Sequence, residues 1–287
     1  MLQYIINGLQ SGSWYSLLAV SIVIVMKASD VPNFAVANMG LVGAFLAYSF
    51  VSAHLPFGVA VVLGLLGAAL FGVIIDRAVI QRLGDKGHFP LLLMTIGISL
   101  SLAAALELIW GTNSLSLNAP WSNKTVHLAG QIINWDGIVT IATGLVIAIA
   151  ITWFFHTTAG VRMRAVAENR SAARLVGVRI SRVSGLAWGI GTAVAALAMI
   201  LQTESSVLSY TAGDALLVPA FVAATAAGFT SPVGAYVAVL VIGVLENLTG
   251  GYISTALQSV VALVVVVLIL LLRPSGFTRT ALARREV

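Results

Sequence analysis

Residues 260–272 read Val-Val-Ala-Leu-Val-Val-Val-Val-Leu-Ile-Leu-Leu-Leu, an unbroken apolar run that decides the fold class. A strand of a membrane β-barrel would alternate apolar and polar residues, and this run does not alternate. Because lipid cannot hydrogen-bond a bare backbone, such a run is expected to be a helix, which pairs its own N–H and C=O groups. Apolar stretches of about 18 or more residues, enough to cross a hydrocarbon core of roughly 30 Å, recur along the chain. The sequence therefore predicts an all-α, polytopic transmembrane helix bundle.

The composition also indicates an integral membrane protein. Of the 287 residues, 59% are hydrophobic and 9% are charged, and the mean hydropathy is +1.02. A soluble domain of this size could not keep so much apolar surface away from water. The net charge of +5 does not indicate a nucleic-acid partner, because the basic residues gather in a few loops, as the positive-inside rule explains. The absence of cysteine excludes disulfides and thiolate chemistry.

Polar segments divide a single domain, residues 1–287, into about eight or nine expected spans. Segments 76–88 and about 156–182 are rich in Lys and Arg and are expected in the cytoplasm, as is the arginine-rich C-terminus. The segment of about 111–136 holds one Lys and two Trp residues, which places it outside. Nine crossings put the N-terminus outside, and eight put it inside. The expected spans are 4–26, 39–53, 59–80, 90–110, 137–155, 183–201, 215–229, 235–248 and 253–272.

A polar island at residues 160–190 carries six arginines between these apolar segments. It contains no proline, its residues are compatible with a helix, and Gly177 is a residue type at which helices end. On one continuous helix, Arg164, Glu168 and Ala172 would share a face. The apolar side chains left for a partner would be Val166, Leu175 and Val178. The alternative is an ordinary basic loop that only enforces topology.

The order of residues in the island carries a resemblance. Residues 164–170 read Arg-Ala-Val-Ala-Glu-Asn-Arg, and Gly177 follows nine residues after the glutamate. This pattern resembles the cytoplasmic loop of the branched-chain amino acid permease family of bacterial ABC transporters. Asn-Phe-Ala at 33–35 and the segment 220–246 are similar to two further family patterns, so the resemblance covers essentially the full chain. The chain departs from its relatives at 36–38, where Val-Ala-Asn replaces His-Gly-Glu or similar polar residues, and at 226–229, where a Gly-Gly pair is missing.

The resemblance implies a permease subunit of an ATP-driven importer in the bacterial inner membrane, with its C-terminus in the cytoplasm. Such a subunit pairs with a second homologous permease or with a copy of itself. It sits on cytoplasmic ATPases that bind ATP and Mg, and a periplasmic binding protein delivers the solute. The solute would be branched-chain amino acids or a related amino acid, amide or carboxylate. The island would be a coupling helix on the ATPase, with the contact made or oriented by Arg164, Ala167, Glu168, Asn169, Arg170, Ala172, Leu175 and Gly177.

No enzyme or metal signature stands out. The chain has no Gly-x-x-x-x-Gly-Lys-Ser/Thr loop, so a partner must hydrolyse any ATP, and no cofactor is expected in this chain. Its four histidines lie in separate loops without the spacing of metal ligands. Asp76, Glu107 and Glu246 fall near the ends of expected spans, where they are expected to reach interfacial water. Two other classes stay open: a secondary transporter or channel, and a membrane enzyme or assembly subunit that transports nothing.

Neutral polar residues in the spans and in the polar break at 27–38, with one adjoining aromatic, are the candidates for the translocation path. A weakly polar path suits a permease whose specificity is set by a binding protein. The alternative reading is that these side chains make helix-packing hydrogen bonds, worth about 1 kcal/mol or less each. The candidates are Asn7, Asn33, Phe34, Asn38, Thr95 and Ser99.

Overall fold

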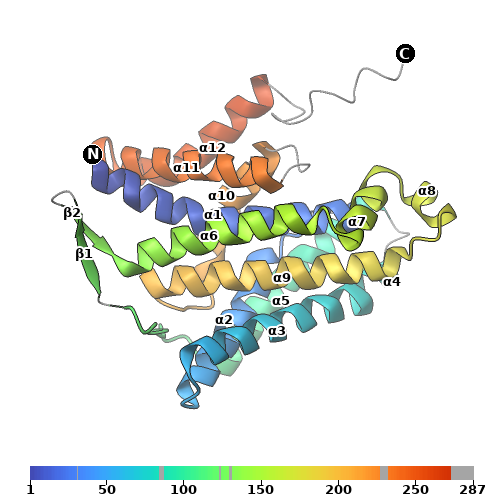
Figure 1. Ribbon diagram of the computed structural model, residues 1–287, viewed down its shortest axis with the longest axis horizontal. Helices are drawn as coiled ribbons and strands as arrows, with labels where there is room; N and C mark the ends of the chain where they lie inside the picture. Colours follow the sequence, from blue (N-terminus) through green and yellow to red (C-terminus); the bar gives the residue numbers. More distant parts are fainter. Residues whose placement is uncertain (31, 84–86, 123, 129–130, 227–231, 273–287) are drawn as a thin grey trace.

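A computed structural model describes residues 1–30, 32–83, 87–122, 124–128, 131–226 and 232–272 (Figure 1). Helices dominate these residues, so the predicted all-α class is confirmed. In chain order they are α1 (Leu2–Ser29), α2 (Val36–Ser52), α3 (Phe57–Ile75), a π-helical turn η1 (Asp76–Ile80), α4 (Gln81–Leu83), α5 (His88–Trp110), α6 (Trp135–Phe154), α7 (Thr158–Glu168), α8 (Arg170–Leu175), α9 (Ile180–Ser205), α10 (Ala212–Ala226), α11 (Pro232–Tyr252) and α12 (Thr255–Leu272).

The number of long apolar helices agrees with the expected spans. Within the described residues, six helical segments are long and apolar enough to cross a membrane, namely Leu2–Ser29, Phe57–Leu83, Phe89–Trp110, Trp135–Phe154, Ile180–Ser205 and Gly234–Tyr252. The shorter helices α2 and α10 are also apolar, and α12 adds a further apolar helix of 18 residues. The chain is therefore a multi-pass membrane protein with about the predicted number of spans.

The segment expected outside contains a small β-hairpin, an element absent from the predicted all-α architecture. Strands β1 (Thr125–Leu128) and β2 (Gln131–Asn134) pair antiparallel, with Thr125 opposite Asn134. The hairpin lies at the end of the bundle where α1 begins and α11 ends, which we call the hairpin end (Figure 1). The rings of Tyr4 and Tyr252, 5.4 Å apart between centroids, join those two helices there. Helices α7 and α8 lie at the opposite end, which we call the basic end (Figure 1).

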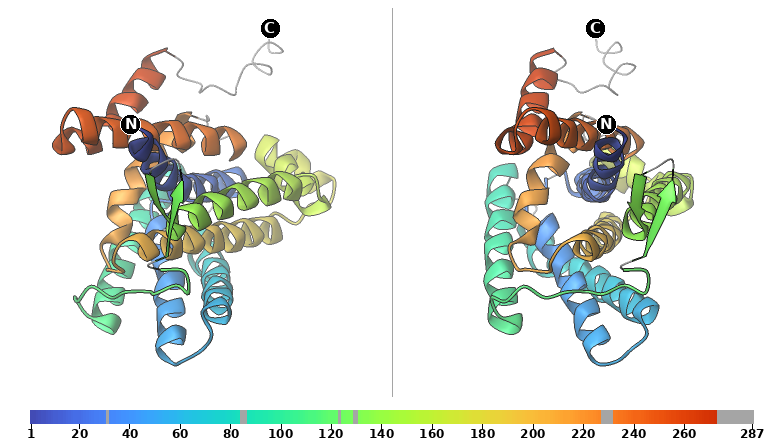
Figure 2. Two further views of the ribbon diagram at one scale, coloured as in Figure 1. Left: turned by 60° about the vertical axis from the view of Figure 1, so that its left-hand side comes forward. Right: turned by 90° about the vertical axis from the view of Figure 1, so that its left-hand side faces the viewer.

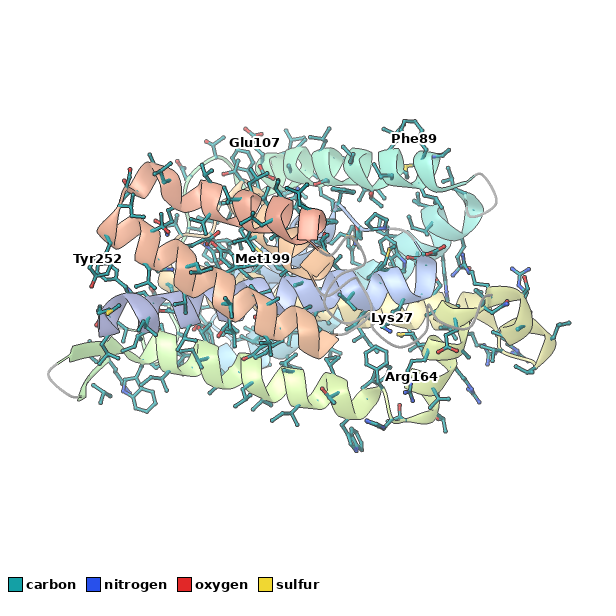
Figure 3. All side chains as sticks on the ribbon, turned by 90° about the horizontal axis from the view of Figure 1, so that it is seen from above. Lys27, Phe89, Glu107, Arg164, Met199 and Tyr252 are labelled. Atoms are coloured by element: carbon teal, nitrogen blue, oxygen red, sulfur yellow. The ribbon has the colours of Figure 1, made fainter. Side chains whose placement is uncertain are left out.

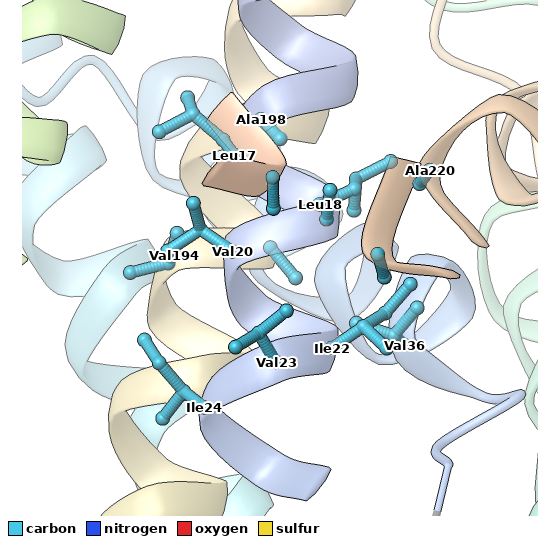
Figure 4. Close-up of a cluster of buried hydrophobic side chains, with 14 of the residues drawn as sticks. Leu17, Leu18, Val20, Ile22, Val23, Ile24, Val36, Val194, Ala198 and Ala220 are labelled. Carbon is cyan, nitrogen blue, oxygen red and sulfur yellow. The ribbon is translucent and has the colours of Figure 1, made fainter. Parts of the chain in front are cut away.

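Helices α1 and α9 form the centre of the bundle. The apolar windows of α1 and α9 are 67% and 78% buried, against 17% to 22% for those of α3, α5 and α6. Helix α1 packs against α9, α11, α6 and α10, and the other helices surround this pair (Figure 2). Figure 4 shows the core that results, where apolar side chains of α1 meet those of other helices. The labelled residues are Leu17, Leu18, Val20, Ile22, Val23 and Ile24 of α1 with Val36, Val194, Ala198 and Ala220. Helices α3, α5 and α6 leave most of their apolar surface exposed, as helices that face lipid do.

Glycines bring α1 and α11 into close contact. A Cβ atom added to Gly8 would lie 2.5 Å from the Val244 Cα atom, and one added to Gly12 would lie 2.9 Å from the Leu240 Cα atom. Close approach through small residues is how helices associate in lipid, where burial of apolar surface supplies little driving force. Any larger side chain at Gly8 must push the two backbones apart.

Candidate coupling segment and polar interior

Helix α7 is anchored on the bundle at the basic end. The Thr157 hydroxyl accepts a hydrogen bond from the Gly160 N–H (3.3 Å) and caps the start of the helix. Met163 and Val166 are 1% and 2% exposed, because α7 packs against α1 and α9. The prediction that Val166 is available to a partner is therefore wrong.

The island is two helices and not one. Asn169 has an extended backbone, with φ −155° and ψ 104°, and it ends α7 and begins α8. Its side-chain oxygen accepts a hydrogen bond from the Ala172 N–H (2.9 Å), which is the usual way for asparagine to cap a helix. The expectation of one continuous helix, with Arg164, Glu168 and Ala172 on one face, is therefore wrong, since the face is interrupted at the cap.

Helix α8 ends where the sequence predicts. Gly177 has φ +84°, a left-handed conformation that favours glycine. Its N–H donates to the Arg174 carbonyl (3.0 Å), and the Val178 N–H donates to the Ala173 carbonyl (3.0 Å). Ala173 is buried, while Leu175 and Val176 are 89% and 77% exposed. The end of α8 therefore presents two apolar side chains beside arginines.

The eight residues predicted to make or orient a partner contact share one property, since all of them are exposed. The end of α1 also lies close to this segment. The ammonium group of Lys27 lies 5.7 Å from the centroid of the Phe155 ring, and it is repelled by the charge of Arg164 and attracted by that of Glu168. Figure 3 shows Lys27 and Arg164 toward the same end of the molecule, with Tyr252 toward the other. The segment is thus exposed on one side and held to the central helix on the other.

Asp76 does not reach interfacial water. Its side chain is fully buried in η1, where one carboxylate oxygen accepts from the Ser184 hydroxyl (2.6 Å) and the other accepts from the Gln81 amide. The Ser181 hydroxyl donates to the Gln81 side-chain oxygen (2.8 Å), and the Gln81 amide also donates to the Ser181 carbonyl (3.1 Å). The prediction for Asp76 is wrong because α9 covers it.

Glu246 is a second carboxylate that the bundle encloses. It is 3% exposed, on α11, and the Tyr15 hydroxyl of α1 donates a hydrogen bond to it. The expectation that Glu246 reaches interfacial water is therefore wrong as well, whereas Glu107 stays partly exposed as expected. The sequence did contain an indication that Glu246 is enclosed, because an ionisable residue within an apolar helix usually faces the interior of the bundle. Among the described residues, no three His, Cys, Asp or Glu side chains come together in a way that could hold a metal ion.

Four of the six path candidates lie where α2 meets α5 and α10. The buried Asn38 amide donates to the Ser99 carbonyl (3.1 Å) and hydroxyl (2.8 Å), joining α2 to α5. The side-chain oxygen of Asn33, also buried, accepts from the Ala35 N–H (2.9 Å) just before α2 begins. The ring of Phe34 stacks on Phe221 of α10, with 4.5 Å between centroids. The start of α2 and the residues just before it thus form a polar contact with α5 and an aromatic contact with α10, two helices distant in sequence.

The other two candidates do not join this cluster through a hydrogen bond. The buried Thr95 hydroxyl donates to the Leu92 carbonyl of its own helix (2.9 Å), which fits the helix-packing alternative. Asn7 is exposed near the hairpin end and accepts from the Gln3 amide (3.1 Å). Asn7 and Asn33 therefore lie at opposite ends of α1.

Comparison with known proteins assigns the family. A family model described as the branched-chain amino acid transport system / permease component matches residues 4–270. The chain belongs to this family. The permease is 28% identical, over 100% of its length and 96% of the relative's, to the high-affinity branched-chain amino acid transport system permease protein LivH of Salmonella typhimurium. It is 27% identical to BraD of Pseudomonas aeruginosa, a permease protein of the same description, over 100% of this chain and 97% of BraD.

A solved structure supports the architecture of the permease. The chain of PsaBC from Streptococcus pneumoniae, determined in complex with a Fab, superimposes with a TM-score of 0.54. The match covers 94% of this chain and 91% of that one at 17% identity, so it bears on the fold alone. The family predicted from residues 164–177 is confirmed by the family model and by the full-length relatives.

Proposed function

We propose that this permease is the membrane-spanning subunit of an ATP-driven importer in the bacterial inner membrane. Its solute is a branched-chain amino acid or a related small amino acid, amide or carboxylate. Cytoplasmic ATPases that bind ATP and Mg drive it, and a periplasmic binding protein delivers the solute. A second permease, homologous or identical to this chain, completes the membrane path.

The exposed end of α8 carries the proposal. A short helix with both ends capped, at Asn169 and at Gly177, is stiffer than an ordinary loop, and it holds Leu175 and Val176 away from the bundle. Exposed apolar side chains rimmed by polar groups mark contact sites for proteins. Arg170 and Arg174 lie beside Leu175 and Val176 in the sequence, so this surface suits an apolar groove with an acidic rim. If that groove belongs to the ATPase, the basic end of the bundle lies in the cytoplasm.

The residues around the start of α2 suit a path that does not itself select the solute strongly. Asn38, Ser99 and Asn33 offer neutral polar groups, and Phe34 with Phe221 offers an apolar surface. An amino acid with an aliphatic side chain presents both kinds of surface. Specificity would then rest with the binding protein that delivers the solute.

Co-purification and uptake test the proposal together. The chain is produced together with candidate ATPases and a candidate binding protein from the same organism, and leucine uptake is measured in vesicles supplied with ATP. A double variant, Glu168→Arg with Gly177→Pro, alters the end of α7 and breaks the cap of α8. We expect it to lose both the ATPases and uptake, while the chain stays in the membrane. Retention of both properties would contradict docking through this segment.

A secondary transporter is the second candidate, because Glu246 is a buried carboxylate within a membrane helix. Such groups often carry protons in transporters. Collapsing the proton gradient with an ionophore separates the two functions. An ATP-driven importer keeps its uptake when ATP is supplied, whereas a carrier that uses Glu246 loses uptake with the ionophore and also in Glu246→Gln.

A further inference from the structure

The buried carboxylate of Asp76 joins two helices that are distant in the sequence. Ser184 and Gln81 donate to its two oxygens, and Gln81 is held in turn by the hydroxyl and carbonyl groups of Ser181. Both serines lie within the first five residues of α9, and Gln81 directly follows the π-helical turn that contains Asp76. A network of four side chains thus fixes the end of α3 against the beginning of α9.

The position of this network relates it to α8. Helix α8 ends at Leu175 and α9 begins at Ile180, so the short turn around Gly177 is all that separates α8 from the network. The carboxylate also interacts with the charges of Arg77, its neighbour in η1, and of Arg170, the first residue of α8. A displacement of α8 therefore reaches Asp76 through the turn around Gly177 and the first residues of α9.

Packing alone does not account for a carboxylate at this site. Burying a charge is costly, and well-packed apolar residues of similar volume usually hold two helices together at least as well. The carboxylate near the first turn of α9 is offset by the positive end of the helix dipole and by two arginines. A carboxylate held by hydrogen bonds from the start of α9 and from Gln81 after η1 responds when these helices shift relative to each other, which suits a positioning role.

We propose that Asp76 is a positioning residue that transmits movement of α8 to α3 and α9 together, so that its charge is needed to couple ATP hydrolysis to solute movement. This inference rests on the proposed function, because it takes α8 to be the ATPase contact. Asp76 is assigned no contact with the solute or the ATPase. It acts through its hydrogen bonds with Ser184 of α9 and with Gln81, which follows η1.

The test is the number of ATP molecules hydrolysed per solute imported. The complete complex, with its ATPases and binding protein, is reconstituted in proteoliposomes, and both rates are measured. Asp76→Asn keeps the shape of the side chain and removes the charge. We expect the variant complex to assemble and hydrolyse ATP, while ATP consumed per solute rises about tenfold, within the range of single-residue effects on coupling between sites. Arg82→Gln is the matched control: it removes a charge from an exposed side chain next to Gln81, and its ratio should equal that of the wild type.

Two further variants keep the inference falsifiable if Asp76→Asn fails to assemble. Ser184→Ala removes one hydrogen bond and leaves the charge, and it should raise the ratio in the same direction by a smaller factor. Gln81→Leu removes the other donor to the carboxylate, and it should raise the ratio as well. Combined with Ser184→Ala, its effect should be less than additive, because both residues act on the same carboxylate. Normal ratios in Ser184→Ala and in Gln81→Leu would overturn the inference.

The outcomes also separate this inference from the proposed function. A wild-type complex that imports solute without ATP, or that recovers no ATPase, would contradict the proposed function itself. A wild-type complex that is coupled normally, with a variant Asp76→Asn in which ATP hydrolysis and transport fall in proportion, would contradict only the role of Asp76.

Discussion

Replacing Gly8 with alanine places a methyl group between α1 and α11. The added carbon would lie 2.5 Å from the Val244 Cα atom and 2.8 Å from the Gly243 carbonyl oxygen. Carbon atoms in favourable contact are about 3.5–4.0 Å apart. Because the obstructing atoms belong to the backbone of a helix, no side-chain rotation relieves the overlap. The two helices must separate by roughly 1 Å along a closely packed contact.

The magnitude follows from two opposing effects. Overpacking of a well-packed interior costs about 1–3 kcal/mol, and alanine regains up to about 1 kcal/mol because it is a better helix former than glycine. The expected net loss is about 1–2 kcal/mol, which corresponds to a melting temperature lower by roughly 2–8 °C for a chain of a few hundred residues. Thermal unfolding in detergent, followed by circular dichroism and by recovery on size-exclusion chromatography, measures this shift.

Gly97 provides the matched control. It lies within α5, and a Cβ atom added there would meet no other atom within 4 Å. Gly97→Ala should therefore leave the melting temperature unchanged or raise it slightly, through helix propensity alone. If Gly8→Ala and Gly97→Ala melt at the same temperature, the close contact of α1 with α11 is not what limits substitution at Gly8.

Three more expectations concern the capped segment and the enclosed carboxylate. Asn169→Ala removes the cap of α8, worth about 1 kcal/mol, and should lower uptake in vesicles. Asn169→Asp keeps a capping oxygen and should retain uptake, and equal uptake in the two variants would argue against the cap. Gly177→Ala puts a Cβ atom on a residue at φ +84°, at a cost of about 1–2 kcal/mol, so less ATPase should co-purify; unchanged recovery would count against this geometry. Tyr15→Phe leaves Glu246 without its donor and should destabilise the permease by about 1–3 kcal/mol in thermal unfolding. Combined with Glu246→Leu, the loss should be smaller than the sum of the single losses, and strict additivity would speak against a direct bond.

Residue types at the ends of helices carry enough information to predict where a helix begins or ends. Gly177 was predicted to end a helix because only glycine tolerates a positive φ at little cost, and it does so. The break at Asn169 has a local signal too, since asparagine is among the preferred capping residues. Because the residues on both sides of Asn169 also favour a helix, one continuous helix was predicted through it. The hairpin follows the same pattern: Thr-Val-His-Leu and Gln-Ile-Ile-Asn, two residues apart, fit a pair of short strands.

The interior could not be predicted in the same way, because it depends on which helices become neighbours. Asp76 and Glu246 are near the ends of apolar segments, and there a carboxylate usually reaches water. Each is enclosed by a helix far away in the sequence, through Ser184 in one case and Tyr15 in the other. The same applies to the candidate path. Asn7 and Asn38 are the same residue type, and only the packing of the helices shows that Asn7 is exposed and Asn38 is buried.

The central place of α1 has a consequence for how the chain enters the membrane. Helix α1 ends at Ser29, while α9 and α11, which bury it, begin at Ile180 and Pro232. During synthesis α1 must therefore wait in lipid for its neighbours. Several of its hydroxyl groups need no neighbour during that interval, because those of Ser11, Ser13 and Ser29 donate to the carbonyl groups of Asn7, Leu9 and Val25 in the same helix, at 3.0, 2.7 and 2.8 Å. The helix that is most enclosed in the finished bundle thus keeps these polar groups satisfied while it is still alone.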